Sequence, residues 1–328
     1  RGAHLAITCF DQPGLKARWS LTVRIPRGAA WQVVGNGAEK SRAEIEIPGE
    51  TGGATVEQTE VSFTETAPLP TYLFSFVVGD FQVETAVRDG RTFRMFHRET
   101  DAAKVARNRD AIFDLHAQAL AYLERYTGMP YAFGKFDFVL IPAFQFGGME
   151  HAGAILYNAS GLLLDESATQ NQLLGRASTI AHETAHMWFG DLVTMRWFND
   201  VWMKEIFANF MAAKIVNPAF PDVNHELRFL LAHYPAAYEV DRTPGANPIR
   251  QPLENLAEAG SLYGAIIYQK APVVMRHLES ILGEEAFRDG VRDYLRAHAF
   301  GNATWSDLIA VLGRRTPQDL PAWSRAWV

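Results

Sequence analysis

Two histidines four residues apart, with a glutamate directly after the first, constrain this chain more than any other feature. They lie in the stretch TIAHETAHMWFGDLVT, as His182, Glu183 and His186. Positions i and i+4 of a helix share one face, so both imidazole rings can point to one metal ion. Glu183 lies close enough to reach a water on that ion without binding the ion. The alternative is a helix with two partly buried histidines that bond to neighbouring groups.

A third candidate ligand follows on the next predicted helix. Eighteen residues separate Glu205 from His186, and the helical run NDVWMKEIFANFMAAKIV contains it. Its neighbours Trp202, Ile206 and Phe207 are apolar, which indicates a buried helix. Two histidines and one carboxylate leave a fourth position for water, as catalytic zinc sites do. A solvated position on the helix surface is the alternative interpretation of Glu205.

Two further polar residues are candidates to orient a ligand imidazole. Asp200 stands near the start of the second helix, and Asn209 lies one turn beyond Glu205. A ligand histidine commonly bonds through its other ring nitrogen to such a group, which fixes the orientation of the ring. A helix cap for Asp200 and an ordinary polar position for Asn209 fit the sequence equally well.

The chain changes character once. Up to residue 98, short β-branched and aromatic stretches are separated by glycine and proline, which is typical of strands. Afterwards long amphipathic runs predict helices, the first of them with Asp101 as its N-cap and Gly128 as its stop. The sequence therefore predicts an α+β protein, with a β-rich module over 1–79 and a mostly helical module with a small β-sheet over 80–328.

Composition argues against several classes of function. The 328 residues carry a formal net charge of -6 and contain no basic run, which argues against nucleic-acid binding. Cys9 is the only cysteine, so an internal disulfide and a thiolate metal cluster are excluded. No stretch is long and apolar enough to span a bilayer. The first residue is not methionine, so we expect a truncated N-terminus; the oligomeric state and compartment stay open, with a slight preference for the cytoplasm.

These motifs together resemble the aminopeptidase N family of zinc metallopeptidases. HExxH, eighteen residues and then glutamate is the pattern of the gluzincin group. The stretches TCFDQPGLKARWSLTV, LPTYLFSFVVGDF and FGGMEHAGAILY resemble further segments of the family, the last being similar to its GxMEN exopeptidase motif. The resemblance covers essentially the whole chain. It implies that 1–79 is the end of a saddle-like N-terminal β-sandwich and 80–328 a thermolysin-like catalytic domain, without the family's C-terminal helical domain.

The resemblance implies a role for each residue of the centre. His182, His186 and Glu205 would bind one zinc ion per chain. Glu183 would be the general base that takes a proton from a zinc-activated water and later passes it to the leaving amine. Tyr268 matches the tyrosine of the family's YxKG segment, and its hydroxyl would donate to the tetrahedral oxyanion.

Glu150 determines which class of peptidase the resemblance implies. In the stretch GGMEH, Gly147 and Gly148 would let an extended peptide pair along an exposed strand edge. The carboxylate of Glu150 would then hold the free α-amine, so that the first peptide bond is cleaved. We therefore expect a zinc aminopeptidase that acts on peptides. The alternatives are a zinc endopeptidase, an epoxide-hydrolysing relative and a non-catalytic scaffold.

The chain departs from the family pattern at four positions. His151 replaces the asparagine of GxMEN, Ala271 the glycine of YxKG, and Ile206 the glycine after the third ligand. Lys204 stands where many members carry asparagine, although some carry lysine. The family's second amine-binding residue would lie before the first residue of this chain. The sequence leaves the side-chain preference of the first subsite open.

Overall fold

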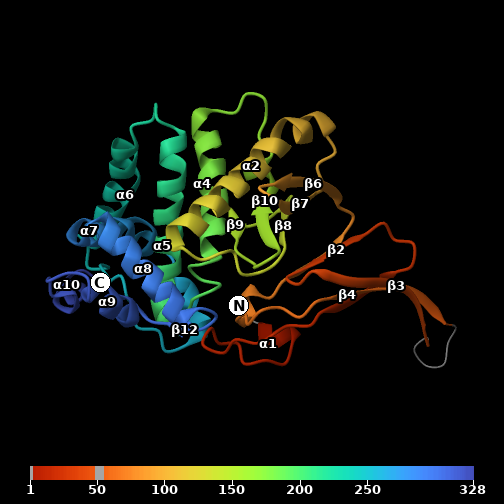
Figure 1. The fold of residues 1–328 in the computed structure, drawn as a ribbon, viewed down its shortest axis with the longest axis horizontal. Coiled ribbons are helices and arrows are strands. Elements are labelled where there is room, and N and C mark those ends of the chain that lie inside the picture. The colour runs from red at the N-terminus through yellow and green to blue at the C-terminus, as the bar shows by residue number, and fades with distance from the viewer. Residues whose placement is uncertain (1–2, 49–54) are drawn as a thin grey trace.

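The regular structure of the N-terminal part consists mainly of strands, in a computed structural model that describes residues 3–48 and 55–328. After the short helix α1 (Ala3–Ala6) come β1 (Thr22–Pro26), β2 (Gln32–Gly35), β3 (Glu39–Ile47), β4 (Val56–Phe63) and β5 (Phe76–Gly79). An antiparallel sheet of order β1-β4-β3 extends to the right in Figure 1, and β2 pairs with β5. Ala54, the first residue of the strand-like stretch ATVEQTEVSF, lies outside the described residues.

A five-stranded sheet follows and supplies one wall of the site. Its strands are β6 (Gln82–Arg88), β7 (Arg91–His97), β8 (Phe136–Ile141), β9 (Gly148–Met149) and β10 (Ile155–Asn158). They lie in the order β6-β7-β8-β10-β9; β8 runs parallel to both its neighbours, while β6 and β9 pair antiparallel at the two edges. β8 is buried along almost its whole length, as a central parallel strand requires. The sheet starts just after the predicted boundary at 79 and 80, and the division into two domains stays a prediction.

The first long helix, α2 (Ala102–Thr127), runs across this sheet in Figure 1. Its ends match the sequence prediction: the Asp101 side chain accepts hydrogen bonds from two backbone amides, and Gly128 ends the helix with a φ of 65°. Its apolar face packs on the strands, for example Phe113 on Phe138 with 5.8 Å between ring centroids. This packing fixes the sheet against the helical layer.

Helices make up most of the remaining chain. They are α3 (Ala159–Leu162), α4 (Gln170–His186), α5 (Val201–Val216), α6 (His225–Asp241), α7 (Ala271–Leu282), α8 (Glu284–His298), α9 (Trp305–Gly313) and α10 (Leu320–Trp327), with the paired strands β11 (Thr194–Met195) and β12 (Asn302–Ala303). α4 and α5 lie side by side in Figure 1. The fold is therefore mixed, with a helical portion and small sheets. Across the described residues, every helix is too short or too polar to cross a membrane.

α4 ends earlier than the sequence suggests. Gly190 and Asp191 resemble a helix end, but the last helical residue is His186. The carbonyl of His186 instead accepts from the amide of Asp191 at 3.0 Å, which closes a wider turn. Gly190 has a φ of 137°, a backbone conformation that L side chains rarely adopt. His186 thus stands at the very end of α4.

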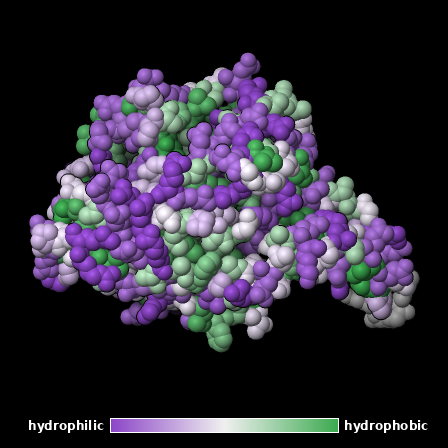
Figure 2. Space-filling view, viewed as in Figure 1, coloured by the Kyte–Doolittle hydropathy of each residue, from purple (hydrophilic) through white to green (hydrophobic). Residues whose placement is uncertain are grey.

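The surface is mostly polar. In Figure 2, hydrophilic residues cover much of the visible face, and apolar residues gather at its lower centre, where Figure 1 places the N-terminal segment. Leu5 and Phe10 of that segment are 85% and 79% exposed.

Candidate metal centre

His182, His186 and Glu205 converge where α4 and α5 pack together. The Nε2 atoms of the two histidines lie 3.0 Å apart. Oε2 of Glu205 lies 3.5 Å from Nε2 of His182 and 3.9 Å from Nε2 of His186. Two imidazole nitrogens and a carboxylate oxygen are donors that zinc prefers. The three ligands predicted from the sequence therefore form one cluster.

The hydrogen bonds of the two rings show that this cluster fits a cation. Nδ1 of His182 lies 2.9 Å from Oδ1 of Asn209, and Nδ1 of His186 lies 3.0 Å from the carbonyl of Phe189. Both partners only accept, so each Nδ1 carries the hydrogen, and each ring presents a lone pair at Nε2 when it is neutral. Two lone pairs 3.0 Å apart repel each other unless a proton or a metal ion lies between them. Burial lowers the pKa of His186 to about 4, which leaves its ring neutral and able to bind a metal.

The two candidate orienting residues behave differently. Asn209 accepts from His182 and thereby orients that ring, as proposed from the sequence. Asp200 does not bond to an imidazole: its two oxygens pair with Nε and Nη2 of Arg250 at 2.6 and 3.2 Å. Asp200 occupies the N-cap position of α5 without a capping bond from its side chain. The prediction for Asp200 is therefore wrong, because its carboxylate pairs with Arg250, which lies 50 positions away in the sequence.

Glu183 lies against the edge strand β9. A Cβ atom at Gly148 would collide with the carboxyl group of Glu183, so only glycine allows the strand to approach this closely. Burial, opposed by His182 and reinforced by Glu150 and Glu205, raises the pKa of Glu183 to about 8. A divalent cation beside the group would lower this pKa again. A carboxyl group tuned towards neutrality in a pocket is suited to accept and release a proton.

Glu150 is buried and already bonded to a lysine. Nζ of Lys204 lies 2.6 Å from Oε1 of Glu150 and 2.7 Å from Oε1 of Glu205. Burial opposes ionisation of Glu150, but Lys204 and His186 outweigh it and hold the pKa at about 2. Glu150 is thus a carboxylate in the pocket. Sequence reasoning noted Lys204 only as a departure from the family pattern, and this bridge is a finding of the structure.

Tyr268 lies in a short π-helical segment, Ile266–Lys270, directly before α7. Single π-turns inside helices often occur at functional sites. Pro272 stands in the first turn of α7, a position that proline favours. Burial raises the pKa of Tyr268 far above its usual range, so its hydroxyl stays protonated and able to donate. The ring stacks on Tyr263, with 6.2 Å between centroids.

A cavity of about 1040 Å³ joins these residues. Every site residue predicted from the sequence except Asp200 lines it. The N-terminal part also contributes, through Asp11, Pro13, Thr71 and Tyr72, which sequence reasoning did not assign to the site. Two stretches that carried the family resemblance, TCFDQPG and LPTYLFSF, contain these four residues, and that was the signal that could have identified them.

His151, which replaces the usual asparagine beside Glu150, bonds to the N-terminal part. Its Nδ1 donates to the carbonyl of Leu73 at 3.2 Å. Asn36 donates to the same carbonyl and to that of Ala152, at 2.9 Å each. These bonds tie the segment after β9 to the N-terminal part, so His151 helps to hold the pocket wall.

Comparisons with known proteins identify the family of this chain. The model of the Peptidase family M1 domain matches residues 112–327. The chain is 33% identical to "Leucyl aminopeptidase" of Saccharolobus solfataricus, over 98% of this chain and 39% of that protein. It is 31% identical to "Aminopeptidase N" of Streptomyces lividans (99% and 36%) and 31% identical to "Endoplasmic reticulum aminopeptidase 1" of Homo sapiens (97% and 32%). The chain thus spans about two fifths of the length of these relatives or less. The chain belongs to peptidase family M1.

Proposed function

We propose that this protein is a zinc-dependent aminopeptidase that hydrolyses the N-terminal bond of peptides. One zinc ion per chain would be held by His182, His186 and Glu205. The observation that carries the proposal is the 3.0 Å approach of two Nε2 atoms whose rings both bond elsewhere through Nδ1. We include in the proposal a thermolysin-like catalytic domain over 80–328 that follows the end of a saddle-like β-sandwich over 1–79.

Glu183 is the residue that moves protons in this proposal. Zinc, when bound, supplies Lewis acidity and lowers the pKa of a water towards about 7. The Glu183 carboxylate faces the same cavity and takes the proton that the attacking water loses. It then delivers that proton to the nitrogen of the amine that leaves. The water oxygen forms the new bond to the carbonyl carbon, and the carbon–nitrogen bond breaks.

Two further elements position the substrate and its developing charge. Tyr268 donates its hydroxyl hydrogen to the oxyanion of the tetrahedral intermediate. β9 is an edge strand, so a peptide in extended conformation can add to its free side. Because glycine lacks a Cβ atom, Gly147 and Gly148 let the backbones of this strand and of the peptide lie close to Glu183. Pairing along β9 aligns the scissile bond with the base on α4.

Glu150 makes the proposed enzyme an exopeptidase. Its carboxylate is buried, lines the cavity and bonds to Lys204, which also bonds to Glu205. A substrate's α-ammonium bound there places the first peptide bond next to Glu183. An endopeptidase would gain nothing from a buried carboxylate at this position. The relatives named above are called aminopeptidases, which agrees with this choice.

The test compares two substrates on the full-length protein loaded with zinc. One is an aminoacyl chromogenic amide and the other is the same amide with its amine acetylated. We expect cleavage of the free amine only, and loss of that preference in Glu150→Gln but not in the exposed control Glu285→Gln. Equal cleavage of both compounds would contradict the aminopeptidase and indicate an endopeptidase. Cleavage of neither would point to a non-catalytic scaffold or another substrate class.

A further inference from the structure

Lys204 has an unusual place in the cavity. It directly precedes Glu205 on α5, and its ammonium bonds to Glu205 and to Glu150 at once, at 2.7 and 2.6 Å. The three side chains are only 7%, 7% and 3% exposed. The ammonium also lies over the ring of Tyr72, 5.7 Å from its centroid. This lysine is therefore fully enclosed by two carboxylates and an aromatic ring.

The two carboxylate oxygens of Glu205 face different groups. Oε2 faces the imidazole nitrogens, while Oε1 faces the ammonium of Lys204. Glu150 lies near His186, within 4.8 Å between possible ligand atoms, but it is not one of the three predicted ligands, and its bond to Lys204 is the shorter one. The ammonium of Lys204 is thus bonded to Glu150, the carboxylate that the proposed function assigns to the substrate's α-ammonium. Both groups are primary ammonium ions with the same hydrogen-bonding needs.

We propose that Lys204 limits how strongly this pocket binds a free N-terminal amine, because its own ammonium holds Glu150. This inference rests on the proposed function, since it concerns the carboxylate that would bind the amine. A substrate must either displace Lys204 from Glu150 or share one carboxylate with it. Lys204 is then a specificity-determining residue rather than a catalytic one.

The geometry makes either route costly for the substrate. Sharing brings two ammonium groups to one carboxylate that is only 3% exposed, where like charges repel more strongly than in open water. Displacement separates a buried ion pair and leaves the ammonium of Lys204 with Glu205 as its remaining carboxylate. Neither cost applies to a ligand that binds the zinc but has no amine. The amine of a substrate therefore adds less affinity here than an unoccupied carboxylate would give it.

Two hydroxamates isolate this effect on the zinc-loaded, full-length protein. Leucine hydroxamate and isocaproyl hydroxamate share the metal-binding group and the side chain, but only the first has an α-amine. Their dissociation constants are measured by titration calorimetry at a pH at which that amine is protonated. The ratio of the two constants reports the amine alone, because any change in the metal site affects both compounds.

Three variants define the test. Lys204→Gln keeps a hydrogen-bond donor without the charge, Lys204→Arg keeps the charge, and Lys104→Gln removes a partly exposed lysine that also bridges two carboxylates. We expect the preference for the amine to rise by about tenfold or more in Lys204→Gln, the range of a charged hydrogen bond, and to stay near the wild-type value in the other two. Isocaproyl hydroxamate should bind wild type and Lys204→Gln alike.

The other outcomes overturn the inference in distinguishable ways. If both compounds bind and the preference in Lys204→Gln falls or rises by less than about tenfold, Lys204 orients Glu150 and does not compete for it. If neither compound binds the wild type, the proposed function fails and this inference fails with it. Should Lys204→Gln not fold, by circular dichroism, the wild type decides: an amine preference below about tenfold supports competition, and a larger one contradicts it.

Discussion

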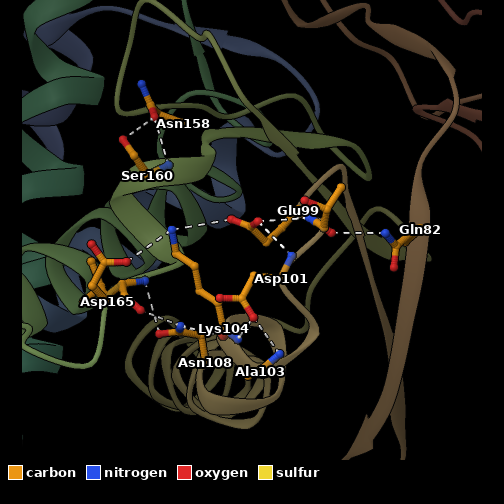
Figure 3. Close-up of polar contacts among 11 residues, drawn as sticks. Gln82, Glu99, Asp101, Ala103, Lys104, Asn108, Asn158, Ser160 and Asp165 are labelled. Atoms are coloured by element: carbon orange, nitrogen blue, oxygen red, sulfur yellow. Dashed lines mark hydrogen bonds and ion pairs between the residues drawn. The ribbon is translucent and has the colours of Figure 1, made fainter.

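Lys204 and Lys104 form the same motif in two different surroundings. Each ammonium lies between two carboxylates, Glu150 and Glu205 for Lys204, and Glu99 and Asp165 for Lys104 (Figure 3). Around Lys104 both distances are 3.4 Å and the three side chains are 23%, 24% and 80% exposed. Around Lys204 the distances are 2.6 and 2.7 Å, and exposure stays at or below 7%.

The contrast shows what burial adds to an ion pair. Near Lys104, backbone amides do most of the organising: Glu99 accepts from the amide of Asp101, and Asp101 caps α2 (Figure 3). Water screens the ammonium there, and such pairs contribute about 0–1 kcal/mol. In the cavity each charge needs a partner, because an unpaired buried charge is strongly destabilising. A cluster that costly to bury is expected where ligands bind rather than where the fold alone needs it.

The largest effect on turnover is expected from replacing Glu183, the proposed general base in the cavity. Glu183→Gln keeps the size of the side chain but cannot accept a proton, so turnover should fall by about a thousandfold. Zinc content should not change, because Glu183 is not one of the three ligands. Turnover assays with metal analysis check both statements. Activity within about tenfold of wild type would refute the assigned base, and Glu285→Gln serves as the exposed control.

The variant Tyr268→Phe removes one hydroxyl group from the cavity and tests what that group contributes to turnover. We expect kcat to fall by about a hundredfold, equivalent to about 3 kcal/mol of transition-state stabilisation. KM for the substrate should change little, since the oxyanion forms only during the reaction. Tyr263→Phe, on the ring stacked against it, is the matched control. An equal loss in both variants would contradict a distinct role for the hydroxyl of Tyr268 as the oxyanion donor.

His116 on α2 is a buried basic group without a charged partner among the described residues. Its contribution to stability should therefore depend on pH. His116 bonds to the carbonyl of Ile112 and the hydroxyl of Tyr157 and stacks on Phe138. Burial lowers its pKa from 6.5 to about 4. Between these values the unfolded chain binds a proton that the folded protein does not, so stability falls as pH falls. The loss attributable to His116 from pH 7 to pH 5 should be about 2 kcal/mol.

Chemical denaturation at these two pH values measures this loss. His116→Gln cannot titrate, so its free energy of unfolding should depend less on pH than that of the wild type by this amount. The same pH dependence in both proteins would mean that other groups cause it. Lys204 in the cavity differs from His116. Its two carboxylate partners outweigh burial and raise its pKa, so it keeps its charge.

The smallest effect is expected at the exposed bridge. Lys104→Gln should lower the free energy of unfolding by less than about 1 kcal/mol, because water already screens its carboxylates. The measurement is a urea titration at low and at physiological salt, and any loss should shrink with salt. A loss of several kcal/mol, independent of salt, would break the comparison between the two lysines.

Local patterns explain which parts of the fold and the site could be predicted. The histidine pair and Glu205 follow from helical spacing, and the ends of α2 follow from Asp101 and Gly128. Pairings between distant residues left no such pattern. The bonds from Lys204 to Glu150 and from Arg250 to Asp200 join residues 54 and 50 positions apart.

The strands show the same limit. β9 has only two residues, too few for an alternation, and its place at the sheet edge is set by pairing with β10. The contributions of Asp11 and Tyr72 to the cavity depend on how the N-terminal part packs against the helices, which no local pattern encodes. Tertiary packing, rather than propensity, therefore determined what sequence reasoning missed.

The most direct test of the account is the number of zinc ions per chain. Full-length protein is dialysed against metal-free buffer after loading, and its zinc is counted by plasma mass spectrometry. We expect one zinc per chain in the wild type and in Glu183→Gln, and almost none in the double variant His182→Gln, His186→Gln. A wild type that retains no zinc, or a double variant that retains as much as the wild type, would contradict the central claim.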